Sequence, residues 1–206
     1  MILNNLSTIE YIFKMKIYIL CNLTEINPDD FSSSLDIRGL KDADEIIEKL
    51  EDINIDKIYC SPYLKTVQTI YPFCNKTNKQ INIEHTFHDA MYKPIIPNIE
   101  MHNPRSINSH FGYSYIFNRI NTYYKSKLFS SNICSIENNI TLQNRIFPFL
   151  HNLCHRYKEI PKNILIVTHQ AILNSIINFC DRTNCSYTTN KKITEISIPS
   201  TWNGIN

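Results

Sequence analysis

Polar side chains that could bind an anionic group follow several predicted strands of this sequence. The segments are Cys21–Asn22, Ser61–Pro62 with Lys65, Asp89, and Thr168–His169. In a parallel α/β sheet, ligands bind beyond the carboxyl ends of the strands, so we expect these side chains to lie close together. Helices follow three of the segments, and the N–H groups and dipole at a helix N-terminus attract anions. The pattern therefore indicates an anion site at one edge of a sheet.

Alternating strands and helices must position these side chains. Short β-rich apolar runs predict strands at 16–21, 55–60, 80–84, 163–168 and 193–198. Helical spacing predicts a helix with Asp36 as its N-cap, a helix opened by Ser61 as N-cap and Pro62, and helices over 140–158 and 171–177. This alternation predicts an α/β fold, a three-layer sandwich with a mostly parallel central sheet.

The domain organisation expected from the sequence is simple. Residues 15–206 form a single domain, and residues 1–14 are a weakly organised N-terminal appendage. Residues from about 85 to 137 carry several prolines and many aromatics without clear periodicity, which is typical of an insertion or a lid. The aromatic stretch from Phe111 to Tyr124 either covers the sheet as core or forms a lid or partner surface.

Four motifs resemble the histidine phosphatase (phosphoglycerate mutase-like) superfamily. Residues 35–43 (LDIRGLKDA) resemble the family's L-T-x-x-G-x-x-Q-A, and residues 59–69 (YCSPYLKTVQT) resemble Y-S-S-P-L-x-R-A-x-Q-T. Residues 87–89 (FHD) resemble L-x-E, and residues 166–169 (IVTH) resemble V-x-S-H-G. The motifs stand in the family's order, across about residues 16–180, and the resemblance implies a phosphoglycerate mutase-like fold.

The resemblance also implies a mechanism, against which the residues of this chain can be compared. In the family, a His after the first strand attacks phosphorus, two Arg clamp the phosphoryl oxygens, and a Glu acts as acid or base. Here Asn22 stands at the nucleophile position, and Cys21 and Lys65 stand at the two Arg positions. Asp89 stands at the acid position. A second family His, which contacts the phosphate, is matched by His169.

Catalysis by the family's route is therefore not expected. A neutral amide at Asn22 cannot carry a phosphoryl group, and losing a nucleophile in a concerted site can cost about 10⁶ in turnover. Leu23 and Gln170 also stand where the family usually has glycines. We expect a pseudophosphatase that binds or scaffolds, with residual phosphate affinity near Lys65 and His169. An active phosphomonoesterase or phosphoglycerate mutase-like enzyme with an altered site is one alternative, and a structural subunit of a larger assembly is another.

Two other kinds of site receive little support. Cys21 could serve as a thiolate nucleophile, but a thiolate phosphatase needs an arginine where Asn27 stands. A metal could be gathered by four histidines of the insertion, but their spacing matches no metal motif; they are His85, His88, His102 and His110. We therefore expect no metal and no cofactor.

The composition of the chain argues against several further classes of function. The only glycines are Gly39, Gly112 and Gly204, so Gly-rich phosphate loops are ruled out. A net charge of +2 with scattered basic residues does not suggest a nucleic-acid partner. No apolar run approaches the roughly 18 residues of a membrane span. Seven cysteines without zinc-type spacing indicate reduced thiols in an intracellular, cytoplasmic setting. The expected partners are a phosphorylated ligand or a protein, and the oligomeric state stays open.

Overall fold

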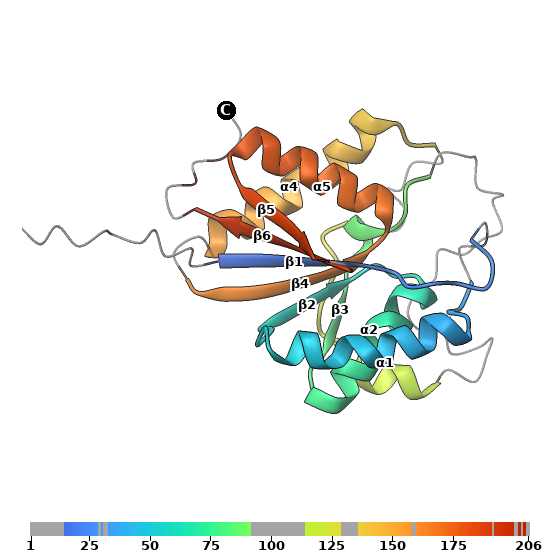
Figure 1. The fold of residues 1–206 in the computed structure, drawn as a ribbon. Helices are drawn as coiled ribbons and strands as arrows, with labels where there is room; N and C mark the ends of the chain where they lie inside the picture. The colour runs from blue at the N-terminus through green and yellow to red at the C-terminus, as the bar shows by residue number, and fades with distance from the viewer. Residues whose placement is uncertain are drawn as a thin grey trace, which may run out of the picture.

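A six-stranded sheet forms the middle layer of the molecule, with its strands in the order β3-β2-β4-β1-β6-β5 (Figure 1). The computed structural model describes residues 15–28, 30, 33–91, 114–128, 136–157, 160–190, 192–199, 202 and 204. The strands are β1 (Met15–Cys21), β2 (Lys57–Cys60), β3 (Ile81–Ile83), β4 (Lys162–Thr168), β5 (Ser186–Asn190) and β6 (Ile193–Ile198). β1 to β4 pair in parallel, whereas β6 and β5 are antiparallel. The predicted α/β class with a mostly parallel sheet is confirmed.

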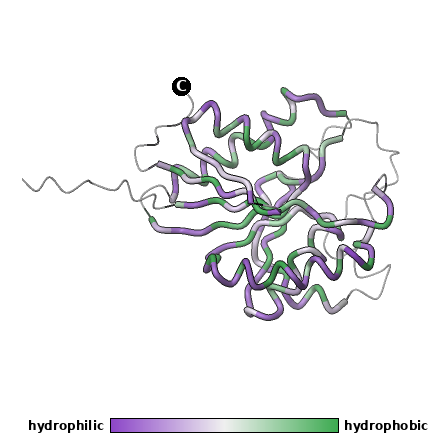
Figure 2. The backbone as a smooth tube through the Cα atoms, in the orientation of Figure 1, coloured by the Kyte–Doolittle hydropathy of each residue, from purple (hydrophilic) through white to green (hydrophobic). Residues whose placement is uncertain are grey.

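Helices cover both faces of the sheet (Figure 1). α1 (Ile37–Glu51) and α2 (Leu64–Thr77) pack on one face, and α4 (Asn139–Tyr157) and α5 (Gln170–Thr183) pack on the other. Two short 3-10 helices are η1 (His85–Phe87) and η2 (Ser114–Arg119). Hydrophobic residues run along the central strands and alternate with hydrophilic residues along the helices (Figure 2).

The strand period divides the buried side chains between two cores. Successive side chains of a strand point to opposite faces of the sheet. Accordingly, Ile17 and Ile19 of β1 belong to the core under α4 and α5, whereas Tyr18 and Leu20 belong to the core under α1 and α2. Each face of the sheet is therefore apolar and needs its own layer of helices, which is why a three-layer sandwich results.

The edge strand β5 was not expected from the sequence. Its residues Ser186–Asn190 are all exposed, and it pairs on one side only, with β6. A polar strand at an edge has no buried face, so it carries no alternation of apolar residues to detect. The strand exists because its backbone completes hydrogen bonds with β6, which alternates as predicted.

Two N-caps predicted from the sequence can be compared with the first residues of α1 and α2 in the structure. The Asp36 carboxylate accepts a hydrogen bond from the Gly39 N–H at 2.6 Å, so its predicted role is confirmed. Ser61 is not the N-cap of α2, because the helix begins at Leu64 after an extended Tyr63 with no side-chain cap. The Ser61 hydroxyl instead makes a hydrogen bond with His169.

The structure describes only part of the predicted insertion at about 85–137. Its residues 92–113 and 129–135, with His102 and His110, lie outside the described residues, as does the predicted appendage 1–14. Within the described part of the aromatic stretch, Phe117 and Tyr124 pack against the two cores, whereas Tyr115 and Tyr123 are exposed. Core packing therefore accounts for part of the described stretch, whereas Tyr123 is 92% exposed. In the described parts, no helix is both long and apolar enough to cross a membrane.

Candidate functional site

The carboxyl ends of β1, β2 and β4 meet at one edge of the sheet, as the sequence predicts. Cys21 is the register partner of Thr168, and the Asn22 N–H donates to the Thr168 carbonyl oxygen at 2.8 Å. The Ser61 N–H donates to the carbonyl oxygen of Val167 at 2.9 Å. These backbone bonds continue the parallel ladders past the strand ends, so the three following segments are held against one another.

His169 lies at the centre of this cluster and is almost fully buried. Its Nε2 is 2.8 Å from the Ser61 hydroxyl, and its Nδ1 is 3.1 Å from Asn22 Oδ1. The Asp89 carboxylate is 3.5 Å from the same Nδ1. Both oxygens facing Nδ1 are acceptors, so this nitrogen carries the proton and Nε2 accepts from Ser61. The structure thus brings together His169, Asn22 and Asp89, three of the predicted site residues.

His169 is held in its neutral form. Burial lowers the pKa of its imidazole well below the usual range, and the nearby Lys65, His88 and Arg145 act in the same direction. A neutral imidazole gives hydrogen bonds but no positive charge to an anion. His169 therefore positions groups around it more than it attracts a phosphate.

Lys65 carries the positive charge of the site, and the chain supplies a negative partner for it. Its side chain is 2% exposed and its ammonium is ion-paired with the Glu25 carboxylate, which is 15% exposed. The other Glu25 oxygen lies 3.5 Å from the Asn22 amide nitrogen. A carboxylate thus lies between Lys65 and Asn22, the positions that the resemblance assigns to the phosphate clamp and the nucleophile. Glu25 was missed by the sequence analysis.

Cys21 and Asp89 line the more open side of the site. Burial raises the pKa of the Cys21 thiol to about 11, and the Asp89 charge adds to this effect. Burial also raises the pKa of Asp89, although the Ala90 N–H and Lys65 oppose the shift. Cys21 Sγ faces Gln170 Oε1 at 3.9 Å. At neutral pH the thiol is protonated, which makes it a weak nucleophile.

The thiol of Cys21 is therefore expected to resist alkylation at neutral pH. With a pKa of about 11, only about one molecule in a thousand is thiolate at pH 8, because each pH unit below the pKa reduces the fraction tenfold. Iodoacetamide labelling followed by peptide mass mapping should show a rate at Cys21 that keeps rising up to about pH 11. A rate that levels off near pH 8 would contradict this and reopen the thiolate alternative.

A buried ion pair fixes the segment that bears Asp89. Arg145 makes two hydrogen bonds to the Glu137 carboxylate, each at 2.7 Å. Its guanidinium also donates to the carbonyl oxygens of Thr86 and His88 at 2.6 and 3.0 Å. Arg145 lies on α4, far along the chain from Asp89, and sequence reasoning missed it. Its fork of donors holds the backbone immediately before Asp89.

The family motifs outside the site hold the loop that follows β1. A Cβ on Gly39 would lie 2.1 Å from the Thr24 carbonyl oxygen, so only glycine lets this loop approach α1. The Leu23 N–H donates to Thr69 Oγ1 at 3.2 Å, and Gln68 Oε1 accepts from the Leu35 N–H at 2.8 Å. These matched motif residues therefore position the loop that carries Asn22 and Glu25.

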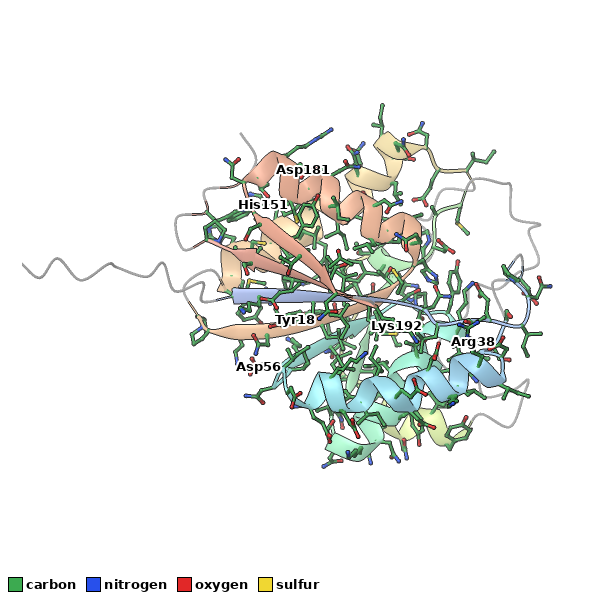
Figure 3. All side chains as sticks on the ribbon, viewed as in Figure 1. Tyr18, Arg38, Asp56, His151, Asp181 and Lys192 are labelled. Atoms are coloured by element: carbon green, nitrogen blue, oxygen red, sulfur yellow. The ribbon has the colours of Figure 1, made fainter. Side chains whose placement is uncertain are left out.

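A cavity of about 510 Å³ opens beside Cys21 and Asn22. Arg38 and Lys192 also line it, and Figure 3 places both on the same side of the molecule, away from Asp56 at the opposite end. Lys192 is ion-paired with Asp42 at 2.6 Å. Among the described residues, no three His, Cys, Asp or Glu side chains cluster in a way that could hold a metal ion.

The fold and the edge site together define a phosphoglycerate mutase-like α/β sandwich. The family model of the histidine phosphatase superfamily (branch 1) matches residues 23–198, and the chain belongs to this family. The match begins one residue after Asn22, so the place of Asn22 rests on the structure, in which it follows β1 and faces His169. A comparison with curated protein sequences finds no match.

Solved structures share the fold at low sequence identity. The ecdysone phosphate phosphatase from Bombix mori, in complex with tungstate, aligns over 93% of this chain and 95% of its own, with a TM-score of 0.65 and 12% identity. The alpha-ribazole phosphatase from Shigella flexneri aligns over 91% of this chain and 96% of its own, with a TM-score of 0.56 and 17% identity. At this low identity, the values establish a shared fold only. Any statement about activity has to come from the residues of the site.

Proposed function

We propose that this protein is a catalytically inactive histidine-phosphatase fold that acts as a binding or scaffold module. The observation that carries the proposal is the Glu25 carboxylate beside Lys65, next to an Asn at the position that follows β1. A phosphate entering this site would meet a carboxylate in contact with the cation it needs. The negative charges of the phosphate and of the Glu25 carboxylate would repel each other, and such repulsion is strong where water is largely excluded.

No other nucleophile among the described residues is well placed to replace the family's histidine. Ser61 is hydrogen-bonded to His169, and the Asp89 carboxylate lies 3.5 Å from Nδ1 of the same imidazole, which resembles a Ser-His-Asp arrangement. However, Ser61 is 0% exposed, so its hydroxyl is closed to an external substrate. Cys21 is protonated at neutral pH for the reason given above. These contacts weigh against the alternative of an active phosphomonoesterase with an altered site.

Residual phosphate binding at Lys65 and His169 requires that Glu25 move away. Lys65 is already paired and His169 is neutral, so the attraction left for a phosphate is small. We therefore infer that the protein recognises a protein or a ligand at a place outside this site. A structural subunit of a larger assembly is the alternative. The described cysteines are free thiols and most are buried, which supports a reducing compartment for the protein.

Turnover of a generic phosphomonoester tests the proposal directly. With p-nitrophenyl phosphate, the wild-type protein is expected to release product no faster than His169→Ala, because both lack a nucleophile able to carry the phosphoryl group. The measurement is product absorbance over hours at several pH values. Wild-type turnover that His169→Ala abolishes would overturn the inactive assignment and favour the altered enzyme.

A further inference from the structure

A second cavity, of about 620 Å³, lies on the α4 side of the sheet. Residues of β2, of the segment 123–128 and of α4 line it. Lys57 at its far end is the first residue of β2, whereas Ser61 follows the last, so the two Cα atoms are about 13 Å apart at ~3.3 Å per residue. The lining includes none of the predicted site residues of the edge, so the two places are distinct, although Thr86 and Arg145 in its wall adjoin the segment that bears Asp89.

Cations gather in this cavity without compensating carboxylates. The lining contains four basic side chains beyond the paired Arg145; they are Lys57, Lys125, Lys127 and Arg156. Within the part of the chain that the structure describes, none of the four is ion-paired with a carboxylate, and no Asp or Glu lines the cavity. Lys127 and Arg156 also face a neighbouring hollow of about 490 Å³, with Asn152 and His155. A concave surface with one sign of charge attracts anions of the other sign.

One wall of the cavity is rigidly built before any ligand arrives. The Glu84 carboxylate is fully buried and accepts hydrogen bonds from the Tyr124 hydroxyl, from Ser126 Oγ at 2.6 Å and from the Lys127 N–H at 3.1 Å. The segment that presents Lys125 and Lys127 is thereby anchored to the end of β3. A preformed wall lowers the ordering cost of binding, which is a main loss in recognition.

Aromatic rings and amides complete the lining. Tyr59 packs edge-on against Tyr124 and Phe149, with ring centroids 5.7 and 5.3 Å apart. Tyr123 extends from the rim and is 92% exposed, so its face is open to a stacking partner. Asn144 and Asn152 add donors and acceptors from α4. Rings for stacking, amides for a heterocycle edge and cations for phosphates occur together, in a volume typical of small-molecule sites.

We propose that the cavity between β2, the segment 123–128 and α4 binds a nucleotide, with its phosphates on Lys127 and Arg156 and its base against the tyrosines. This assignment is independent of the state of the edge site. The ligand class follows from the pairing of an aromatic rim with unpaired cations, because an inorganic anion would not use the rings and an uncharged nucleoside would not use the cations.

Calorimetric titration of the full chain with ADP tests this site. Saturable binding is expected, with at least tenfold weaker affinity for Lys127→Ala and for Arg156→Ala, since each variant loses a charge-assisted hydrogen bond to the phosphates. Both side chains are exposed, so their removal leaves the core intact. Lys41→Ala, on the opposite face, is the matched control and should bind as the wild type does.

Two further titrations separate the parts of the ligand. Pyrophosphate and adenosine are each expected to bind at least tenfold more weakly than ADP, and Tyr123→Ala should weaken ADP without affecting pyrophosphate. Equal affinity for pyrophosphate and ADP would overturn the assignment of a nucleotide. Absence of saturation at millimolar ADP, or an equal loss in Lys41→Ala, would overturn the site itself.

Discussion

Phosphate is expected to stabilise the Glu25→Gln protein while leaving the wild type nearly unchanged. Replacing the carboxylate by an amide keeps the shape of the side chain and removes the charge that faces Lys65. The ammonium, 2% exposed, then lacks a counter-charge, and breaking a buried pair costs about 3–5 kcal/mol of unfolding free energy. An inorganic phosphate that takes the place of the carboxylate would restore part of this loss.

The size of the effect follows from linkage. With phosphate at about ten times its dissociation constant, the folded state gains about 1.4 kcal/mol. For a chain of this length, that gain raises the melting temperature by roughly 3–6 °C. Thermal unfolding should be followed in phosphate and in chloride at equal ionic strength, so that general screening is the same in both.

An exposed ion pair provides the control for this experiment. Lys76 and Glu51 are paired at 2.9 Å with half-exposed side chains, so Glu51→Gln should change the free energy of unfolding by less than about 1 kcal/mol. It should also show no response to phosphate. A wild-type protein that is stabilised by phosphate as strongly as Glu25→Gln would mean that Glu25 does not occupy the anion position.

The sequence predicted most of the frame that holds this site, for identifiable reasons. Strand β4 was found because it is a short, continuous, β-rich apolar run, and helix α1 because its apolar residues repeat with the helix period; both signals involve neighbouring residues only. Asn22, Lys65 and His169 were brought together because parallel strands end at a common edge. Such expectations need only local pattern and topology.

Glu25 and Arg145 belong to the site region but were not predicted from the sequence. Glu25 pairs with a lysine on another element, and in sequence it is one of three acidic residues in the polar loop at 24–34. Arg145 lies on the helical pattern of α4, and its partners Glu137, Thr86 and His88 come from separate parts of the chain. Pairings of this kind depend on tertiary packing and leave no period in the sequence.

Three residues of the matched family motifs have the same structural role. Gly39, Gln68 and Thr69 hold the loop after β1 against α1 and α2, either by close approach or by hydrogen bonds to its backbone. The same loop carries Asn22 and Glu25. The matched residues thus keep the loop in place, whereas the residues at its centre differ from the family pattern, which is the combination expected if the fold is retained for something other than phosphoryl transfer.

Restoring the family's residues in this loop should require the removal of Glu25 as well. The Cys21→Arg/Asn22→His protein carries a guanidinium and an imidazole at these two positions, but the Glu25 carboxylate still lies beside Lys65. Adding Glu25→Gln frees Lys65, and a donor to the transition-state charge contributes about 10²–10³ in turnover. We therefore expect the triple variant to hydrolyse p-nitrophenyl phosphate about 100-fold faster than the double variant and to form a detectable phosphohistidine.

The design leaves Leu23 in place, because it is buried against Leu35 and Ala43, and shortening a buried leucine costs about 2–5 kcal/mol. Cys21 lines the open cavity, so an arginine side chain has space there. Adding Glu51→Gln in place of Glu25→Gln gives the matched control, which should stay at the level of the double variant. Equal turnover with and without Glu25 would show that the carboxylate does not compete with phosphate, since both proteins carry the same nucleophile. A folded triple variant that neither turns over nor accepts a phosphoryl group would mean that residues outside this loop also prevent phosphoryl transfer.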